Sequence, residues 1–270
     1  MPTEPISSLQ NSRIKRLVKL RERKHRDREG VMLLDELRIV RRALEAGVGL
    51  SEAYVCGELL DHHDAGGDLH HLLVEHAVPL IEVAPHVMEK AAYRQNPEGV
   101  IAVATPPAHD LADLMLPERA LVLVLEDVEK PGNLGAVVRT ASGAGVHAVL
   151  ACGVGADPWN PNCLRASTGA VFTVPTIAAS REEIVAWLHE RGLALVATTL
   201  DTDTVHTDLD LTGAVAILMG AEDTGLSPAL LEVSDHRCRI PMQGAADSLN
   251  VSVAAAILVY EALRQRSLSP

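Results

Sequence analysis

The chain alternates between two kinds of hydrophobic pattern. Short, unbroken apolar runs are typical of strands buried on both faces, and apolar residues three or four apart are typical of amphipathic helices. In the C-terminal half such runs predict strands near 121–125, 147–151, 170–174, 194–199, 214–219 and 237–241. Helices are predicted near 133–144, 181–191, 228–233 and 248–266. This alternation indicates an α/β fold with a mostly parallel sheet covered by helices on both faces.

A smaller α/β pattern precedes a proline-rich segment. Its strands are expected near 31–34, 53–56, 79–83 and 99–104, and its helices near 36–46, 59–77 and 85–92. Residues 1–10 are expected to form a disordered tail. The run Thr105-Pro-Pro-Ala-His-Asp reads as a linker, because paired prolines interrupt regular structure. We therefore expect an N-terminal domain over 1–105, a linker over 106–118 and a second domain over 119–270.

One segment departs sharply from the charge of the whole chain, which is −12. Between Asn11 and Arg28 there are nine basic and two acidic residues. Ile14, Leu17 and Val18 recur at helical spacing, which predicts an amphipathic helix with a basic outer face. A solvated helix face is one interpretation, and contact with a nucleic-acid backbone is the favoured one. The candidate contacts on this helix are Arg13, Lys15, Arg16, Arg23 and Lys24.

Composition excludes several classes of protein. At 270 residues with 47% apolar side chains, the chain can bury a core and is not expected to be disordered. Its four cysteines have no paired spacing, as expected of reduced thiols in the cytoplasm. No apolar run is long enough to span a membrane, and no signal peptide is expected. Five histidines fall in 59–77 without a cysteine or carboxylate set, which favours an exposed helix over a metal site.

Three strand–loop–helix segments carry the chemistry. They are 121–141, 214–227 and 239–256. The first contains Pro131-Gly-Asn-Leu-Gly-Ala, which lacks the Lys-Ser/Thr of a phosphate loop and the glycine spacing of a dinucleotide fold. In the third, Asp247 or Ser248 is expected to cap a helix that opens with several polar groups, an ordinary capped core helix being the alternative. The carboxyl ends of parallel strands meet at one edge, so the three loops predict a ligand site there.

In this order, over about residues 121–266, the three segments resemble the motifs of the SpoU (TrmH-type) branch of the SPOUT RNA methyltransferases. The resemblance implies a trefoil-knotted domain that binds S-adenosylmethionine, forms homodimers and methylates a ribose 2′-hydroxyl in RNA, with 23S ribosomal RNA favoured. The first domain resembles the ribosomal-protein-like RNA-binding domain often attached to these enzymes. Transfer RNA is the alternative substrate. A non-catalytic RNA-binding or ribosome-assembly protein is the alternative class.

The resemblance also assigns roles to single residues. The residues it implies for catalysis are Asn133, Arg139, Glu222, Ser248 and Asn250. Those implied for the cofactor are Thr199, Gly220, Ile240 and Leu249, and Arg165 is implied on the substrate side. No metal is implied. The first domain departs from the family where Asp35-Glu36 replaces the usual Glu-Gly, which alters the expected substrate contacts of that loop.

Arg139 has two possible roles. The family's general-base proposal requires a neutral side chain, and deprotonating an arginine at pH 7 costs about 8 kcal/mol. A charged Arg139 that holds a phosphate or stabilises the developing alkoxide avoids that cost. Both roles stand as hypotheses.

Overall fold

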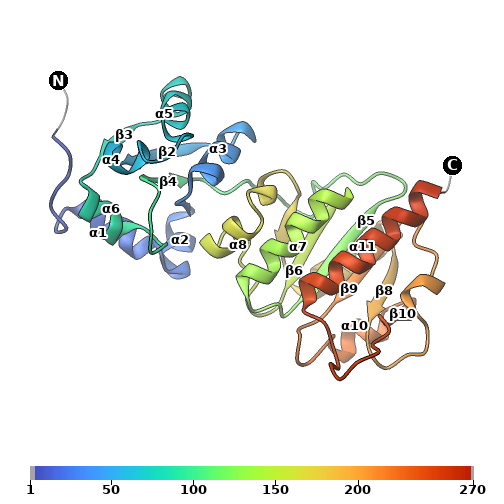
Figure 1. Ribbon diagram of the computed structural model, residues 1–270. Coiled ribbons are helices and arrows are strands. Elements are labelled where there is room, and N and C mark those ends of the chain that lie inside the picture. Colours follow the sequence, from blue (N-terminus) through green and yellow to red (C-terminus); the bar gives the residue numbers. More distant parts are fainter. Residues whose placement is uncertain (1–3, 269–270) are drawn as a thin grey trace. The chain divides into compact units, whose positions relative to one another are not determined.

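The structure is a computed structural model that describes residues 4–268 (Figure 1). It divides into two compact units. The first consists of the described residues up to Ala108 together with Trp159–Phe172. The second consists of His109–Pro158 and the described residues from Thr173 onward. Residues 159–172 therefore pack with the first unit, although they follow the first strands of the second unit in sequence.

The first unit is built on a four-stranded sheet in the order β1-β4-β2-β3. Its strands are β1 (Met32–Leu34), β2 (Leu50–Val55), β3 (Leu80–Glu82) and β4 (Val100–Ala104). The central β4 runs antiparallel to both β1 and β2, whereas β2 and β3 are parallel. The helical segments are α1 (Ser12–Leu20), α2 (Arg23–Glu29), α3 (Leu37–Glu45), α4 (Gly57–Leu60), α5 (Gly66–Glu75), α6 (Pro85–Ala91), α8 (Pro161–Ala166) and η1 (Ala170–Phe172).

Three expectations for the first unit were wrong. The expected basic helix is two helices, because residues 21 and 22 between α1 and α2 are not helical. The helix expected over 59–77 is also divided, because the chain turns so tightly that a Cβ on Gly66 would lie 2.2 Å from the Leu60 carbonyl oxygen. The described part of the expected tail is ordered. Ile6 donates to Glu82 O at 2.9 Å and accepts from Ala84 N at 3.0 Å, and its apolar side chain packs on the core. Residues 1–3 lie outside the described residues.

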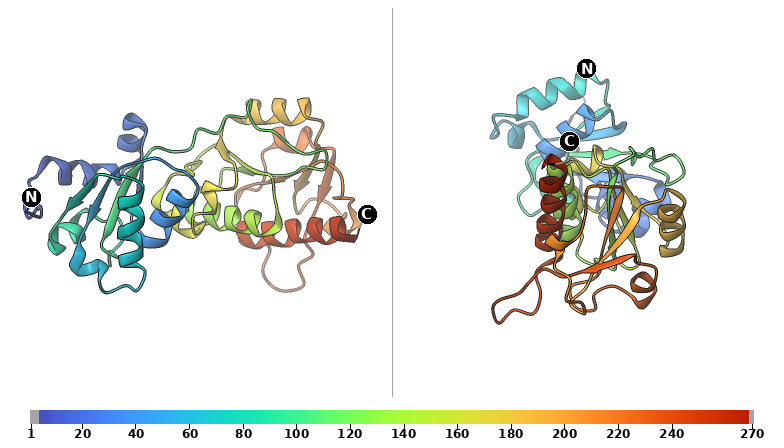
Figure 2. Two further views of the ribbon diagram at one scale, coloured as in Figure 1. Left: turned by 90° about the horizontal axis from the view of Figure 1, so that it is seen from above. Right: turned by 90° about the vertical axis from the view of Figure 1, so that its right-hand side faces the viewer.

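The second unit is a six-stranded parallel sheet in the order β10-β8-β9-β5-β6-β7. Its strands are β5 (Leu121–Glu126), β6 (Ala148–Cys152), β7 (Thr176–Ala178), β8 (Ala194–Thr198), β9 (Val215–Met219) and β10 (His236–Cys238). Helices α7 (Pro131–Ala144) and α11 (Val251–Leu268) cover one face, and α9 (Arg181–Glu190) and α10 (Pro228–Glu232) cover the other (Figure 2). A short helix η2 (His206–Asp208) follows β8. The α/β class with a parallel sheet between helices is confirmed.

Two predictions for residues 119–270 were wrong: one predicted strand is not a strand, and the last helix begins later than expected. The strand expected near 170–174 is the buried turn η1, and the strand lies later, at β7. A short apolar run fits any buried segment, so its period does not separate the two. The last helix begins at Val251 and not near Ser248, because the Asn250 side chain caps it by accepting from Ser252 N at 3.0 Å. Ser248 lies in the exposed loop before it.

The carboxyl edge of the sheet is held by one buried acid. Glu126 ends β5 and is completely buried. Its carboxylate accepts from Arg181 Nε at 2.5 Å and from Ser227 N at 2.7 Å. Because Arg181 opens α9 and Ser227 caps α10, Glu126 ties the starts of both helices to the central strand.

The four cysteines are buried free thiols. Within residues 4–268 no helix combines the length and the apolar character needed to cross a bilayer.

Candidate active site

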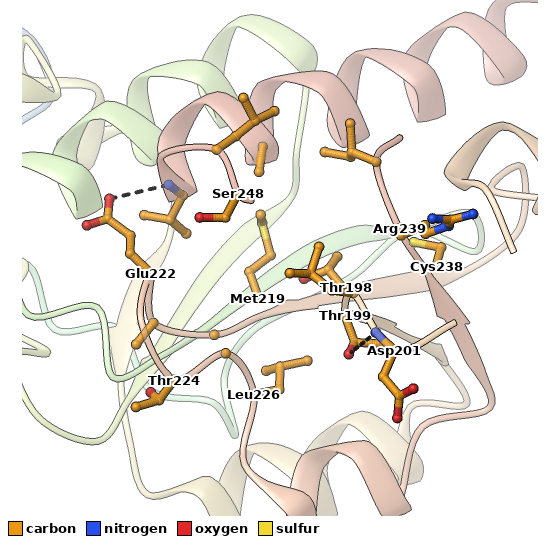
Figure 3. A pocket seen from close by; sticks show the side chains of 18 of the residues that line it. Thr198, Thr199, Asp201, Met219, Glu222, Thr224, Leu226, Cys238, Arg239 and Ser248 are labelled. Carbon is orange, nitrogen blue, oxygen red and sulfur yellow. Dashed lines mark hydrogen bonds between the residues drawn. The ribbon is translucent and has the colours of Figure 1, made fainter. Parts of the chain in front are cut away.

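A cavity of about 380 Å³ opens at the carboxyl ends of β8, β9 and β10 in the second unit (Figure 3). Met219, Leu226 and Leu258 supply apolar walls. The four residues expected to bind the cofactor all line this cavity, and they are Thr199, Gly220, Ile240 and Leu249. They come from loops that are distant in sequence and meet because parallel strands end at the same edge.

Gly220 serves a purpose that the sequence did not reveal. The resemblance implied Gly220 only as a cofactor residue. A Cβ at this position would lie 2.0 Å from the carbonyl carbon of Gly225 and 2.3 Å from Leu226 N. The missing side chain therefore lets the turn after β9 fold back on itself, and that turn positions Glu222.

Glu222 is the centre of a hydrogen-bond network that joins the three sequence motifs. Its Oε1 accepts from Asn133 Nδ2 at 2.8 Å and from Asn250 Nδ2 at 2.5 Å. Its Oε2 lies 3.3 Å from Lys130 Nζ. Asn250 Nδ2 also lies 3.3 Å from Asn133 Oδ1. Both oxygens of Glu222 are thus occupied. Glu222 lines both the cavity and a smaller hollow of about 240 Å³, and Asn133 lines the smaller one.

Ser248 and Arg139 have different relations to this network. Ser248 lines the cavity, and in Figure 3 its hydroxyl points toward the end where Glu222 lies. Arg139 is exposed on α7 and does not line the cavity. Its side chain forms no hydrogen bond or ion pair with a described residue. The single chain therefore gathers Asn133, Glu222, Ser248 and Asn250 and leaves Arg139 outside the group.

The charges around the cavity include one residue that sequence reasoning missed. Of the residues that line it, all of them described, three are acidic, namely Asp201, Glu222 and Asp223, and Arg239 alone is basic. Arg239 Nε is buried and has no hydrogen-bond partner among the described residues. No sequence signal singled it out, because Arg237, two residues earlier, is also basic. Next to it, burial raises the pKa of the Cys238 thiol to about 11, so this group stays neutral near pH 7.

The basic residues expected to contact RNA differ in whether an acidic side chain is already paired with them. Arg16 is paired with Glu29 at 2.7 Å and Glu52 at 2.5 Å. Arg23 lies 3.3 Å from Asp27, and Lys24 lies 2.7 Å from Glu22. Arg13 and Lys15 are exposed on α1 and form no ion pair with a described residue. The free positive charge therefore lies on α1, where Lys19 adds to it.

Arg165 lies on α8 in the first unit, beside the unusual Asp35-Glu36 pair. It donates to Asn162 Oδ1 at 2.5 Å, and its Nε is 3.8 Å from Glu36. Asp35 is buried and accepts from Tyr93 N and Arg94 N at 3.1 and 3.0 Å. Burial raises the pKa of Asp35 despite these bonds. The departure from Glu-Gly thus builds a polar cluster around Arg165.

Among residues 4–268, no three His, Cys, Asp or Glu side chains are grouped in a way that could hold a metal ion.

Two sequence models of known families match this chain. The sequence model of the SpoU rRNA Methylase family matches residues 120–260, and that of the MRM3-like substrate binding domain matches residues 11–102. The 23S rRNA (guanosine(2553)-2′-O)-methyltransferase RlmP of Bacillus subtilis is 29% identical, covering 94% of this chain and 97% of that protein.

Two solved structures extend the comparison. One is the crystal structure of an RNA 2′-O ribose methyltransferase whose sequence is 44% identical to this chain. It superposes with a TM-score of 0.85, and the match covers 97% of this chain and 99% of that one. The SpoU methyltransferase AviRb of Streptomyces viridochromogenes, in complex with AdoMet, is 30% identical, with a TM-score of 0.86 over 96% of this chain and 100% of that one.

Proposed function

The chain belongs to the SpoU rRNA methylase family, and from that membership we infer that it is an S-adenosylmethionine-dependent enzyme that methylates a ribose 2′-hydroxyl of 23S ribosomal RNA. The observation in its own structure that carries this conclusion is the meeting of Asn133, Glu222 and Asn250 beside a cavity of cofactor size. The trefoil knot is a feature that family membership implies.

The cavity suits S-adenosylmethionine in size and in the chemistry of its lining. Its volume lies within the range of small-molecule sites, about 300–1,000 Å³. Apolar walls suit the adenine ring, and loop backbone at Thr199, Gly220, Ile240 and Leu249 would hold the polar edges. When bound, the cofactor would supply a methyl carbon made electrophilic by its bond to a positively charged sulfur.

We propose that Glu222 positions its neighbours and does not accept the ribose proton. Its two oxygens are already occupied by Asn133, Asn250 and Lys130. A carboxylate whose two oxygens both accept hydrogen bonds fixes the amide groups that donate to it. Asn133 and Asn250 would then fix the ribose, with Ser248 orienting the hydroxyl from the loop before α11. Holding the reacting atoms in line is itself a large contribution to catalysis.

Arg139 acts in this proposal as a fixed cation. It is exposed and unpaired among the described residues, so it is free to meet a phosphate of the RNA. A guanidinium binds phosphate in a bidentate manner and stabilises negative charge on an oxygen nearby. The proton of the hydroxyl leaves through water or phosphate as the new bond forms.

Two copies of the chain are proposed to pair through the face of α7 and α11. α11 exposes Val253, Tyr260 and Leu263, with 48, 50 and 37% of each residue accessible. These positions share one stripe of the helix, and an exposed apolar stripe of this kind is typical of a protein interface. Gly143 of α7 lies beneath it, since a Cβ there would be 3.2 Å from the Tyr260 hydroxyl.

The first domain, 1–105, is proposed to bind the RNA substrate through α1, with 106–118 as a linker to the catalytic domain, 119–270. Its match to a substrate binding domain and its free basic residues support this division. We place the protein in the cytoplasm, where ribosomal RNA and reduced thiols are found.

The experiment that tests the function is methyl transfer from labelled S-adenosylmethionine to purified RNA. We expect label in 23S RNA and not in transfer RNA, at a 2′-O position that mapping in a deletion strain identifies. Label in transfer RNA alone would favour the alternative substrate. Binding of RNA without methyl transfer would favour a non-catalytic assembly protein.

A further inference from the structure

Two arginines of the first unit are joined by a continuous chain of contacts that the proposed methyl transfer does not use. The guanidinium carbon of Arg21 lies 5.9 Å from the centre of the Tyr93 ring. The Tyr93 hydroxyl accepts from Asn162 Nδ2 at 3.1 Å, and Asn162 Oδ1 accepts from Arg165 Nη2 at 2.5 Å. These residues come from the break after α1, from the segment after α6 and from α8, and all of them belong to the first unit.

Tyr93 is fixed through both its backbone and its side chain. Its N donates to Asp35 Oδ2 at 3.1 Å, and its hydroxyl is bound by Asn162. Asp35 is buried, and it is one of the two residues that stand in place of the family's usual Glu-Gly. Because the ring is already held in position, little freedom is lost when a flat ligand stacks beside it. The unusual loop thus supports an aromatic ring at the surface of the first unit.

Arg21 lies where α1 ends and the chain turns toward α2. The buried Arg26 donates to Leu20 O and Arg21 O at 3.3 and 3.1 Å, which fixes the backbone of this turn. The Arg21 side chain is exposed and forms no ion pair with a described residue. Its guanidinium is therefore a flat cation that lies over an aromatic ring and that no described acid neutralises.

The chain offers few other aromatic surfaces. It has two tryptophans, three tyrosines and one phenylalanine, all of them described. Tyr260 belongs to the stripe of α11 that is proposed for the dimer. Tyr93 and Trp159 are partly exposed, and of these two Tyr93 alone has a described guanidinium over its ring. The remaining three are buried, namely Tyr54, Phe172 and Trp187.

Unpaired bases of RNA stack on aromatic rings and on the plane of an arginine side chain. We propose that the Arg21–Tyr93 pair binds one unpaired base of the RNA, with the base against the guanidinium, an inference that rests on the proposed function. The exposed charges of α1 lead directly to this pair, since Lys19 in the last turn is two residues before Arg21. Phosphate contacts position the strand along α1, and the stacked base selects a loop or single strand over a paired helix.

The test measures stacking and affinity with two RNA probes. One is a hairpin with 2-aminopurine in its unpaired loop, whose fluorescence falls when that base stacks, and the other is a fully paired duplex of the same length. We expect the wild-type protein to quench the hairpin and to bind it more tightly than the duplex. Arg21→Gln should weaken binding of the hairpin by about tenfold, within the usual value of one stacked base, and binding of the duplex far less.

Arg21→Lys separates stacking from charge. Lysine keeps the positive charge, so the salt dependence of binding should remain that of wild type, and it lacks the plane, so the quenching should be lost. Tyr93→Phe keeps the ring and should retain most of the affinity for the hairpin, whereas Tyr93→Leu should lose it. Arg38→Gln is the matched control, because Arg38 is an exposed arginine on α3 of the same unit without an ion pair to a described residue.

Full quenching by Arg21→Lys would overturn the inference, since the residue would then act as a charge alone. Equal losses for hairpin and duplex in Arg21→Gln, or an equal loss in Arg38→Gln, would also overturn it. Arg21 is exposed, so its variants decide the matter even where Tyr93→Leu does not fold. Wild-type protein that methylates 23S RNA without quenching the hairpin removes only this inference, whereas quenching without methyl transfer removes the proposed function.

Discussion

Asn250 caps a helix and joins the hydrogen-bond network of Glu222 through one amide. Its Oδ1 caps α11 by accepting from Ser252 N at 3.0 Å, and its Nδ2 donates to Glu222. The cap and the Glu222 network thus share a residue, so the start of α11 and the proposed ribose site are fixed together. Ser248 has no such structural bond among the described residues and only lines the cavity.

We therefore expect Asn250→Ala to abolish most methyl transfer and to lower the free energy of unfolding by about 1 kcal/mol, the typical value of a cap. Ser248→Ala should lower the rate without changing the melting temperature. Single-turnover methylation and thermal melting on the same samples measure both effects. Full activity in a destabilised Asn250→Ala protein would restore the interpretation of α11 as an ordinary capped core helix.

Arg139→Lys separates the two roles of that residue. As a fixed cation, lysine keeps the charge and loses the planar fork, so some activity should remain with a pH profile like that of wild type. As a neutral base, lysine, which ordinarily ionises near pH 10.4, would deprotonate more readily and shift the rise in rate to lower pH. Single-turnover rates from about pH 6 to 10 distinguish these outcomes. A new ionisation seen only in the variant would refute the fixed-cation role.

At the scale of elements, α1 shows how a helix can carry both a core and a binding surface. Ile14, Leu17 and Leu20 are buried, so deleting the N-terminal segment would expose the core of the first unit. RNA binding is better tested by replacing the exposed charges of α1 alone.

The triple change Arg13→Gln, Lys15→Gln and Lys19→Gln should weaken RNA binding and flatten its salt dependence. Each lost phosphate contact lowers the slope of log affinity against log salt by about 0.7–0.9. Cofactor affinity should not change. Arg23→Gln with Lys24→Gln is the comparison, and its effect should be smaller because Asp27 and Glu22 already offset these charges. An unchanged salt slope in the triple variant would exclude α1 as the RNA surface.

The end of α11 supplies a prediction about stability and pH. Hydrogen bonds from Arg264 at 2.8 and 2.7 Å, and one from Gln265, lower the pKa of Glu261 to about 2. A carboxyl group whose folded pKa lies below its unfolded value, near 4.3, stabilises the fold above that pH and loses this effect as pH falls toward the folded pKa. Glu261→Gln should thus lower stability at pH 7, and its difference from wild type should shrink below about pH 4. Denaturant unfolding across pH checks this, and a difference that does not vary with pH would contradict it.

At the scale of the whole molecule, the proposed dimer depends on the exposed stripe of α11. Placing a charge at its centre, as in Tyr260→Glu, should convert a dimer to a monomer, because a buried unpaired charge is strongly unfavourable. Light scattering after size exclusion measures the mass. Val74→Glu is a suitable control, since Val74 is similarly exposed, at 55%, on α5 of the first unit. A wild-type protein that is monomeric at micromolar concentration would end the proposal.

The sequence by itself determined the α/β class, most element positions and the three loops of the site. Apolar runs such as Leu121–Leu125 report burial on both faces of a sheet, and parallel strands bring their following loops to one edge. That is why Asn133, Glu222 and Asn250 could be expected together, once the resemblance had singled them out.

Only the tertiary structure decided how these groups are used, because hydrogen-bond partners depend on distances that local periodicity does not contain. It showed Glu222 saturated, Gly220 required by its own turn, and Asn250 in place of Ser248 as the helix cap. It also showed that Arg16 pairs with two acidic side chains and that residues 159–172 pack with the first unit. Arg239 is the clearest case, since nothing in its sequence neighbourhood predicts a buried, unpartnered donor among the described residues at the end of the cavity. Sequence pattern records which residues are buried, and long-range packing decides what each buried polar atom faces.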